Sequence, residues 1–260
     1  MRRLTGSEVL KAVAEIVAVE NCSQDQTLES LKEIQDSDSD LGYRLVIIKN
    51  AQNYGLGGSQ KIAYRYFLDN GFTHFIIIHG DNQGHGDEMA RNFLRELHQH
   101  PDADSIVASR FTKGSDLSQY SWLRRAANLF FNSLTTFLTG VRMSDAGTGL
   151  LLYRTEILCQ FPFEDLTNSF QFNPQLNILL YSRKDLKIVE IPLNWRDSKE
   201  KSNIRALHYC LTLFMILFHY RIHKTFLRQS GWRLFHKTSQ KIDPSFEILR
   251  PQVKARIPDV

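Results

Sequence analysis

The sequence has few cysteines and no long apolar run, and each absence excludes a class of protein. Its 260 residues include three cysteines, too few to close a disulfide framework, and no CxxC pair suggests a zinc site. No apolar run reaches the roughly 18 residues expected of a membrane span. With 42% hydrophobic residues the chain is nevertheless able to bury a large core, which excludes a disordered protein.

Several catalytic and nucleotide-binding motifs are also missing. The sequence has no HExxH motif and no GxSxG elbow, so the signatures of zinc proteases and α/β-hydrolases are absent. Two glycine-rich loops, NYGLGG at 53–58 and SDAGTG at 144–149, lack both the GxGxxG spacing and the GK[ST] ending of nucleotide-binding loops. Taken singly, each loop is more typical of a turn than of a binding site.

What the sequence does contain is a regular alternation of apolar strands and amphipathic helices. Strands that are apolar throughout favour an α/β fold with a mainly parallel sheet flanked by helices. In such sheets ligands bind beyond the carboxyl ends of the strands. We expect strands at 15–19, 43–50, 73–80, 104–111 and 187–195, helices at 28–35, 59–71, 87–100, 121–140 and 203–229, and a loose tail after them.

A carboxylate directly follows the expected strand at 73–80. Asp81 lies in the segment HGDNQG, and its oxygen suits Mg²⁺ or Mn²⁺, with Gln83 able to add a carbonyl oxygen or to hold a metal-bound water. The alternative is an ordinary turn, because the glycines and the asparagine around Asp81 all favour turns.

Arginines follow the next strand and begin the next helix. Arg110 comes at the end of the strand expected at 104–111, and Arg124 and Asn128 are spaced i,i+4, so they share one helix face. Guanidinium groups bind phosphate oxygens in a fork, so this set suits a phosphate ligand. The alternative is that the helix arginines are ordinary solvated charges.

The C-terminal part of the chain is strongly basic. Residues 201–260 carry 11 lysines and arginines against three acidic residues, whereas residues 1–200 are net acidic. The helix expected at 203–229 contains a ten-residue apolar stretch with basic flanks, which suits a membrane interface, although a core or dimer-forming helix is the alternative. We therefore predict a domain at 1–200 and a basic membrane-interface segment at 201–260, in a peripheral protein of the cytoplasmic membrane face. Nucleic acid is not an expected partner, because no RNA-binding aromatic signature accompanies the basic residues.

Taken in order, these segments resemble the family 2 glycosyltransferases of the GT-A fold, and more specifically the polyprenyl-phosphate sugar transferases of the dolichol-phosphate mannosyltransferase type. EIVAVENCSQDQT is similar to the family's EIIVVDDGSxDxT, NYGLGG to NxGxGxA, and IIIHGDNQG to the DxDxQ segment. VASRF, RRAAN and SDAGTGLLLYR are similar to GSRF, RxxxN and SDxxTGFRLY, and KIVEIPLNW is similar to EVPVxW. The shared order of these matches makes the combination specific.

The resemblance implies a GT-A (Rossmann-like) fold and a metal-assisted transfer of a sugar from a nucleotide sugar to a polyprenyl phosphate. The lipid phosphate is already anionic, so this reaction needs no strong general base. The site residues that the resemblance implies are Asp81, Asp145 and Arg110 for catalysis, Asp81 and Gln83 for Mg²⁺ or Mn²⁺, Glu20, Asn21, Asn53 and Gly55 for the nucleotide sugar, and Arg110, Arg124 and Asn128 for the acceptor phosphate.

Some positions depart from the family's pattern. His79 stands where the first Asp of DxD is usual, Asn21 stands where a second Asp is usual, and Asn173 begins a segment that often holds an acid. We also expect the family's first strand, of the type VxVVIPxYNE, to be missing. These departures leave open a second interpretation, a catalytically impaired or fragmentary homologue that acts as a partner or scaffold subunit.

Overall fold

The computed structural model describes residues 8–37, 39–81, 83–196, 206–226, 235, 242 and 244–251. The chain forms two compact units, one from residues 1–55 together with 243–260 and one from residues 56–242. Within the described ranges each unit has its own β-sheet with helices beside it, so the expected α/β class is confirmed. The functional boundary that the charge pattern places at residue 200 stays a prediction.

The first unit contains a three-stranded sheet in the order β1-β2-β7. β1 (Ile16–Glu20) and β2 (Leu45–Asn50) run parallel, and β7 (Phe246–Leu249) pairs antiparallel with β2. The expectation of a loose C-terminal tail is wrong for Phe246–Leu249, which form β7. Its four residues are too few to show a strand pattern in the sequence, and they take this conformation because they complete the hydrogen bonding of β2.

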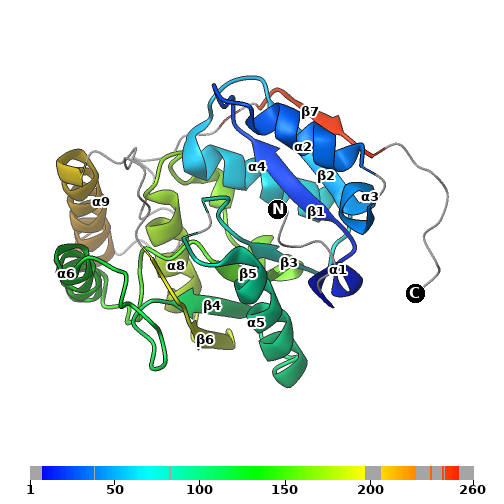
Figure 1. Cartoon of the computed structure of the whole chain (residues 1–260). Coiled ribbons are helices and arrows are strands. Elements are labelled where there is room, and N and C mark those ends of the chain that lie inside the picture. The colour runs from blue at the N-terminus through cyan, green and yellow to red at the C-terminus, as the bar shows by residue number, and fades with distance from the viewer. Residues whose placement is uncertain are drawn as a thin grey trace. The chain divides into compact units, whose positions relative to one another are not determined.

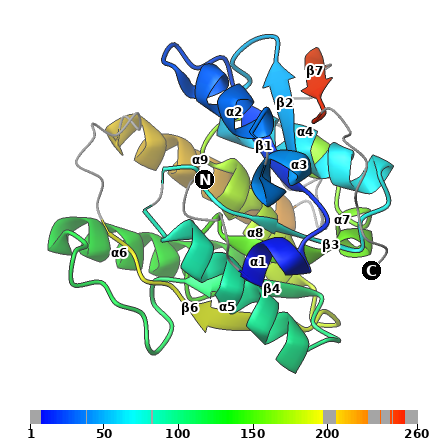
Figure 2. The same cartoon turned by 45° about the vertical axis from the view of Figure 1, so that its right-hand side comes forward.

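Three helices accompany this sheet, α1 (Glu8–Ala12), α2 (Thr27–Gln35) and α3 (Asp40–Arg44) (Figures 1 and 2). The strand that we expected to begin at residue 43 begins at Leu45, because α3 continues to Arg44. The hydroxyl of Ser39 accepts a hydrogen bond from the Gly42 amide and caps α3, so Tyr43 and Arg44 end a helix instead. The Gln35 side chain donates to the carbonyl of Leu45 at 2.7 Å and to that of Leu249 at 2.9 Å, which joins α2 to both β2 and β7.

The second unit contains a four-stranded sheet in the order β3-β5-β4-β6. Its strands are β3 (His74–Ile77), β4 (Ser105–Ser109), β5 (Leu151–Arg154) and β6 (Ile188–Pro192). β4 and β6 are parallel, but β5 runs antiparallel to both β3 and β4. The expectation of a mainly parallel sheet is therefore wrong, since both sheets are mixed. The chain enters β5 from the end at which β4 finishes, where the Thr148 hydroxyl donates to the Ala108 carbonyl at 2.6 Å.

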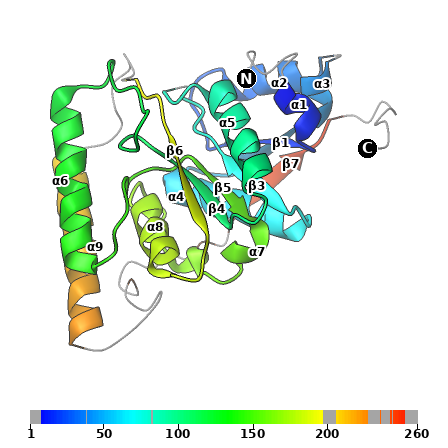
Figure 3. The ribbon, with the colours of Figure 1, turned by 90° about the horizontal axis from the view of Figure 1, so that it is seen from below.

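Helices cover both faces of this sheet, and Figure 3 shows α5 and α8 on opposite sides of it. The helical elements are α4 (Gly55–Asp69), α5 (Gly86–Gln99), α6 (Trp122–Thr139), α7 (Thr155–Leu158), the 3₁₀ turn η1 (Phe163–Asp165), α8 (Phe172–Ser182) and α9 (Ala206–Thr225). Side chains alternate between the faces of a strand, so neighbours enter different cores. Leu152 packs with Met89 and Phe93 of α5. Tyr153 instead packs its ring 5.9 Å from that of Tyr64 on α4.

α6 and α9 lie side by side at one end of the second unit (Figure 3). They run in the same direction, because Asn128 and Tyr209 near their starts line one small cavity and Lys224 near the end of α9 donates to the Thr139 carbonyl at 2.7 Å. α6 ends at Gly140, whose φ of 73° is the left-handed conformation that glycine adopts readily, as the sequence predicts. The outer residues of the helix expected at 203–229 lie outside the described ranges. In the part of the chain that is described, no helix is long and apolar enough to cross a membrane.

Candidate active site

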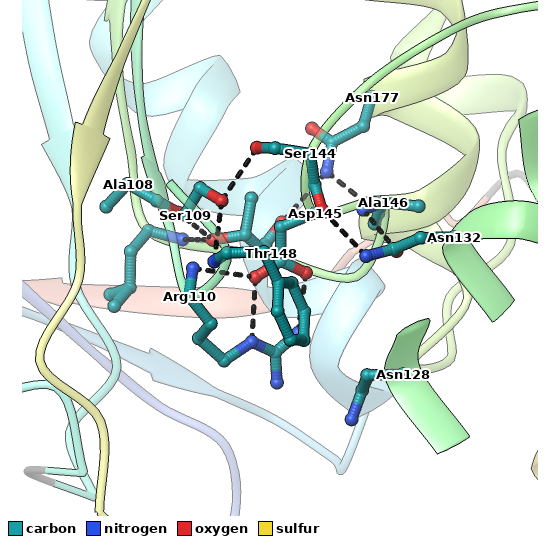
Figure 4. A network of polar contacts seen from close by, with 12 residues as sticks. Ala108, Ser109, Arg110, Asn128, Asn132, Ser144, Asp145, Ala146, Thr148 and Asn177 are labelled. Atoms are coloured by element: carbon teal, nitrogen blue, oxygen red, sulfur yellow. Dashed lines mark hydrogen bonds and ion pairs between the residues drawn. The ribbon is translucent and has the colours of Figure 1, made fainter. Parts of the chain in front are cut away.

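A buried ion pair between Arg110 and Asp145 stands at the carboxyl end of β4. Arg110 donates from Nε to Oδ2 of Asp145 at 2.7 Å, from Nη2 to Oδ1 at 2.6 Å, and from its backbone amide to Oδ2 at 3.1 Å (Figure 4). The two side chains are only 11% and 1% exposed. Burial lowers the pKa of the Arg110 guanidinium, but the charge and hydrogen bonds of Asp145 outweigh it and raise the pKa. Arg110 therefore remains charged, and the hydrogen bonds hold the two side chains in one geometry.

The loop that carries Asp145 is fixed by hydrogen bonds from three sides. The Asn132 amide of α6 donates to the Ser144 carbonyl at 2.7 Å and accepts from the Ala146 amide at 3.0 Å (Figure 4). Asn177 of α8 donates to the carbonyls of Ala146 and Thr148 at 3.0 and 2.9 Å. The Ser144 hydroxyl donates to that of Ser109 at 2.7 Å. The SDAGTG loop is thus a rigid support for the carboxylate.

Tyr120 joins residues predicted to bind the acceptor phosphate into one hydrogen-bonded network. Its hydroxyl accepts a hydrogen bond from Nη1 of Arg110 at 3.4 Å and another from Nδ2 of Asn128 at 2.6 Å. Asn128 also donates to the Arg124 carbonyl at 2.8 Å, and the Arg124 side chain is exposed on the same helix. The structure therefore brings Arg110, Asp145 and Asn128 together, with Arg124 one helical turn from Asn128.

The predicted metal ligands follow β3. Oδ1 of Asp81 accepts from the Gln83 amide at 3.0 Å, and Nε2 of Gln83 donates to the Arg196 carbonyl at 3.3 Å. Burial lowers the pKa of the His79 imidazole, and the charge of Arg110 adds to this, whereas Asp81 and a hydrogen bond with the Gly149 backbone oppose it. His79 is therefore neutral near pH 7 and adds no charge to the site.

Gly149 allows the close approach of His79. A Cβ atom at position 149 would lie 2.4 Å from Nδ2 of Asn173 and 2.5 Å from Nε2 of His79, closer than carbon atoms approach such groups. The final glycine of SDAGTG is thus required by packing at this site.

A metal ion fits this donor set only with help from a substrate. Among the described residues, no group of three His, Cys, Asp or Glu side chains could hold a metal ion. Mg²⁺, however, is often bound through one or two carboxylates together with substrate phosphates. Asp81 with the side-chain oxygen of Gln83 suits that second arrangement.

The four predicted nucleotide residues lie together in the first unit. Oδ1 of Asn21 accepts from Nδ2 of Asn50 at 3.0 Å and from the Tyr54 amide at 2.9 Å, while its Nδ2 donates to Oδ1 of Asn53 at 2.9 Å. Asn53 also accepts from the Gly55 amide at 2.9 Å, at the start of α4. These amides join the carboxyl ends of β1 and β2, where the fold places ligands.

Glu20 ends β1 and is buried, with 4% of its surface exposed. Its Oε1 accepts a hydrogen bond from the Ser23 amide at 2.5 Å, so the carboxylate shapes the loop after β1.

Sequence reasoning missed three residues that hold the site. Asn177 had a signal, since it is a polar residue between Leu176 and the apolar run 178–180 of α8. Asn132 had another, because Asn128, Asn132, Thr135 and Thr139 recur at helical spacing along α6. Tyr120 lies in a loop and had none, because no periodicity connects it to Arg110.

The chain belongs to glycosyltransferase family 2, whose sequence profile matches residues 7–161. Family membership supports a transferase that uses a nucleotide-sugar donor, and enzymes of this family commonly use a divalent metal. The two mixed sheets with flanking helices are consistent with a GT-A-type fold.

A distant relative is the polyprenol monophosphomannose synthase of Mycolicibacterium smegmatis (strain ATCC 700084 / mc(2)155), which is 26% identical over 143 residues. The aligned part covers 55% of this chain and 52% of that protein, so the chain spans about half the length of the relative.

Proposed function

We propose that this chain is a GT-A glycosyltransferase that moves a sugar from a nucleotide sugar to a polyprenyl phosphate, with Mg²⁺ or Mn²⁺, as a peripheral protein on the cytoplasmic face of a membrane. The observation that carries the proposal is the network of Arg110, Asp145, Tyr120 and Asn128 at the end of β4. It gathers a guanidinium group and an amide donor that suit phosphate oxygens. The similarity to a polyprenol monophosphomannose synthase supports the same acceptor class.

The acceptor phosphate would approach from the side of α6. Two nitrogens of Arg110 already bind Asp145, so Arg110 would offer Nη1, which points to Tyr120. Arg124 and Asn128 would complete the phosphate contacts from α6. Asp145 would act as a positioning residue that fixes the guanidinium, since a phosphate nucleophile needs no proton removed by a base.

The nucleotide part of the donor would bind at the strand ends of the first unit. Asn21 and Asn53 offer amide groups that suit the base or ribose of a nucleotide, with Glu20 and Gly55 shaping the loops on either side. Asp81 and Gln83 would hold the metal ion, which when bound would neutralise charge on the leaving diphosphate.

The metal site can be tested by restoring a carboxylate. His79→Asp should tighten Mn²⁺ binding in calorimetry of the free protein, because it adds an oxygen ligand and a negative charge beside Asp81. His98→Asp, on the exposed side of α5, adds the same charge elsewhere and should leave Mn²⁺ binding unchanged. An unchanged dissociation constant in His79→Asp would count against the site.

The activity itself is tested with purified chain, Mn²⁺, a short-chain polyprenyl phosphate and a panel of labelled nucleotide sugars. We expect labelled lipid in the organic extract from at least one donor. If no donor gives product while the Mycolicibacterium relative works under the same conditions, the proposal fails.

The second candidate is a catalytically impaired homologue that acts as a partner or scaffold subunit. His79 in place of an acid favours it, since Asp81 is then left to serve the metal without that second carboxylate. Binding of a nucleotide sugar without any transfer would support this candidate.

A further inference from the structure

Glu190 is an acidic residue at the centre of the apolar strand β6, and its side chain is half-buried. Its neighbour Ile191 packs into the core on the α5 side of the sheet. Successive side chains of a strand alternate between the two faces, so Glu190 points to the side of α8. A carboxylate on a packed face of a sheet needs hydrogen-bond donors around it, and its partners therefore show what it holds in place.

The carboxylate of Glu190 accepts hydrogen bonds from three separate segments. Its Oε1 accepts from the Tyr181 hydroxyl of α8 at 2.7 Å and from the Ser144 amide at 3.4 Å. Its Oε2 accepts from the Thr112 hydroxyl at 3.3 Å. Burial raises the pKa of Tyr181, and the charge of Glu190 raises it further, so the phenol keeps its proton and remains a donor. One side chain therefore joins α8, the SDAGTG loop and the segment that follows β4.

Two of these contacts stand beside the buried ion pair. Ser144 directly precedes Asp145, and Thr112 follows Arg110 by two positions. The Ser144 hydroxyl also donates to that of Ser109, the residue before Arg110, at 2.7 Å (Figure 4). The loop that carries the guanidinium and the loop that carries its carboxylate partner are therefore both bound to one acidic side chain of β6.

We propose that Glu190 is a positioning residue for the acceptor phosphate, because it sets the spacing between the loop that carries Arg110 and the loop that carries Asp145. The inference rests on the proposed function, in which Arg110 binds that phosphate. Nε and Nη2 of Arg110 already bind Asp145, so the direction of Nη1 depends on how both loops are held. A displacement of such a group by roughly 1 Å can reduce a rate about a hundredfold.

The test measures two affinities by calorimetry, one for a short-chain polyprenyl phosphate and one for nucleotide sugars with Mn²⁺. Glu190→Ala should bind the polyprenyl phosphate at least about tenfold more weakly, since it removes the hydrogen bonds to both loops. Its affinity for the nucleotide sugar should stay at the wild-type value, because the predicted nucleotide contacts Asn21 and Asn53 lie in the first unit. A general loss of structure would instead weaken both affinities.

Glu190→Gln separates hydrogen-bond geometry from charge. Its side-chain oxygen can still accept from Tyr181 and Ser144, and its amide can donate to the Thr112 hydroxyl, so this variant should recover most of the lost affinity. Glu156→Ala removes a carboxylate that is 69% exposed, and this matched control should bind the polyprenyl phosphate as the wild type does. If circular dichroism shows that Glu190→Ala does not fold, Thr112→Val takes its place, with an expected loss of about threefold and a nearly unchanged melting temperature.

Four results would overturn the inference. They are wild-type binding of the polyprenyl phosphate by Glu190→Ala, an equal loss of both affinities in that variant, a Glu190→Gln variant as weak as Glu190→Ala, and a wild type that does not bind the polyprenyl phosphate. The proposed function fails separately, when a wild type that binds the polyprenyl phosphate transfers sugar from no donor. Dependence of that binding on Glu190 would still support the positioning role.

Discussion

Asp145 and Arg110 stabilise each other, because they form an ion pair that is almost fully buried. Removing one partner of a buried pair leaves the other uncompensated. We expect Asp145→Asn to lower the free energy of unfolding by about 3 kcal/mol in a denaturant titration, and to reduce sugar transfer at least about tenfold because the guanidinium loses its fixed position.

Asp185→Asn is the control for this substitution. Asp185 pairs with Arg183 at 2.5 Å, but its side chain is 62% exposed, so water replaces the lost contact. The Asp185→Asn variant should keep the wild-type midpoint of denaturation. Equal effects of the two substitutions would contradict the role given to the buried pair.

Gly149 sets the distance between the SDAGTG loop and His79. Gly149→Ala should lower stability by about 2 kcal/mol, since the added methyl group meets Asn173 and His79 and the surroundings must move. Gly80→Ala has open space around its Cβ position and should change the melting temperature little. If Gly149→Ala and Gly80→Ala have the same melting temperature, the close packing around Gly149 is not important for stability.

These residue contacts were only partly predictable. The motif order pointed to Arg110, Asp145 and Asn128, and the structure brings them together. That Arg110 is already held by Asp145 could not be read from the sequence, because it depends on β5 entering the sheet beside β4. Direct contact between two residues 35 positions apart is a property of the folded chain.

At the scale of elements, α4 is joined to the segment before α8 by a buried lysine. Lys61 has no exposed surface, and its Nζ donates to the Leu166 carbonyl at 2.5 Å and to Oδ1 of Asn168 at 2.7 Å. Burial lowers the pKa of Lys61 from its ordinary value of 10.5 to about 8, although the charges of Asp165 and Glu164 partly oppose this.

The lowered pKa gives stability a definite dependence on pH. Between pH 8 and 10.5 the unfolded chain binds a proton that the folded chain does not, so this residue adds stability as the pH rises. The unfolding free energy of the wild type minus that of Lys61→Met should therefore increase across this window, by up to about 3 kcal/mol. The same difference for Lys32→Met, at an exposed position of α2, should stay flat. A difference that falls with pH would show that Lys61 is not desolvated.

The elements themselves were more predictable than their arrangement. β1 to β4, β6, α5 and α6 were expected close to where they occur, because apolar strands and helical periodicity are local signals. β5 and β7 have four residues each and owe their conformation to their neighbours, β3 and β4 for one and β2 for the other. The direction of β7 makes the first sheet mixed and that of β5 makes the second sheet mixed, and no local pattern encodes the direction of a strand.

For the whole molecule, the separation of charge along the chain should make lipid binding depend on salt. Raising NaCl from 0.1 to 1 M shortens the screening length from about 10 Å to about 3 Å. We expect flotation with anionic vesicles to fall several-fold but not to vanish, since the exposed apolar side chains of α6 and α9, such as Phe137 and Leu207, are not screened by salt. Pure phosphatidylcholine vesicles serve as the control, and their weaker binding should hardly change. Complete loss at high salt would mean that these apolar side chains do not enter the bilayer.

The pairing of β7 with β2 also has a consequence for how the chain is made. Gln35 and Leu249 are 214 positions apart, yet one hydrogen bond joins them in the first unit. Residues 56–242 form a continuous unit that emerges completely from the ribosome before β7 does. The first unit, whose strands are translated earliest, is therefore the last to be completed, and during translation one edge of β2 waits unpaired and open to pairing with other chains.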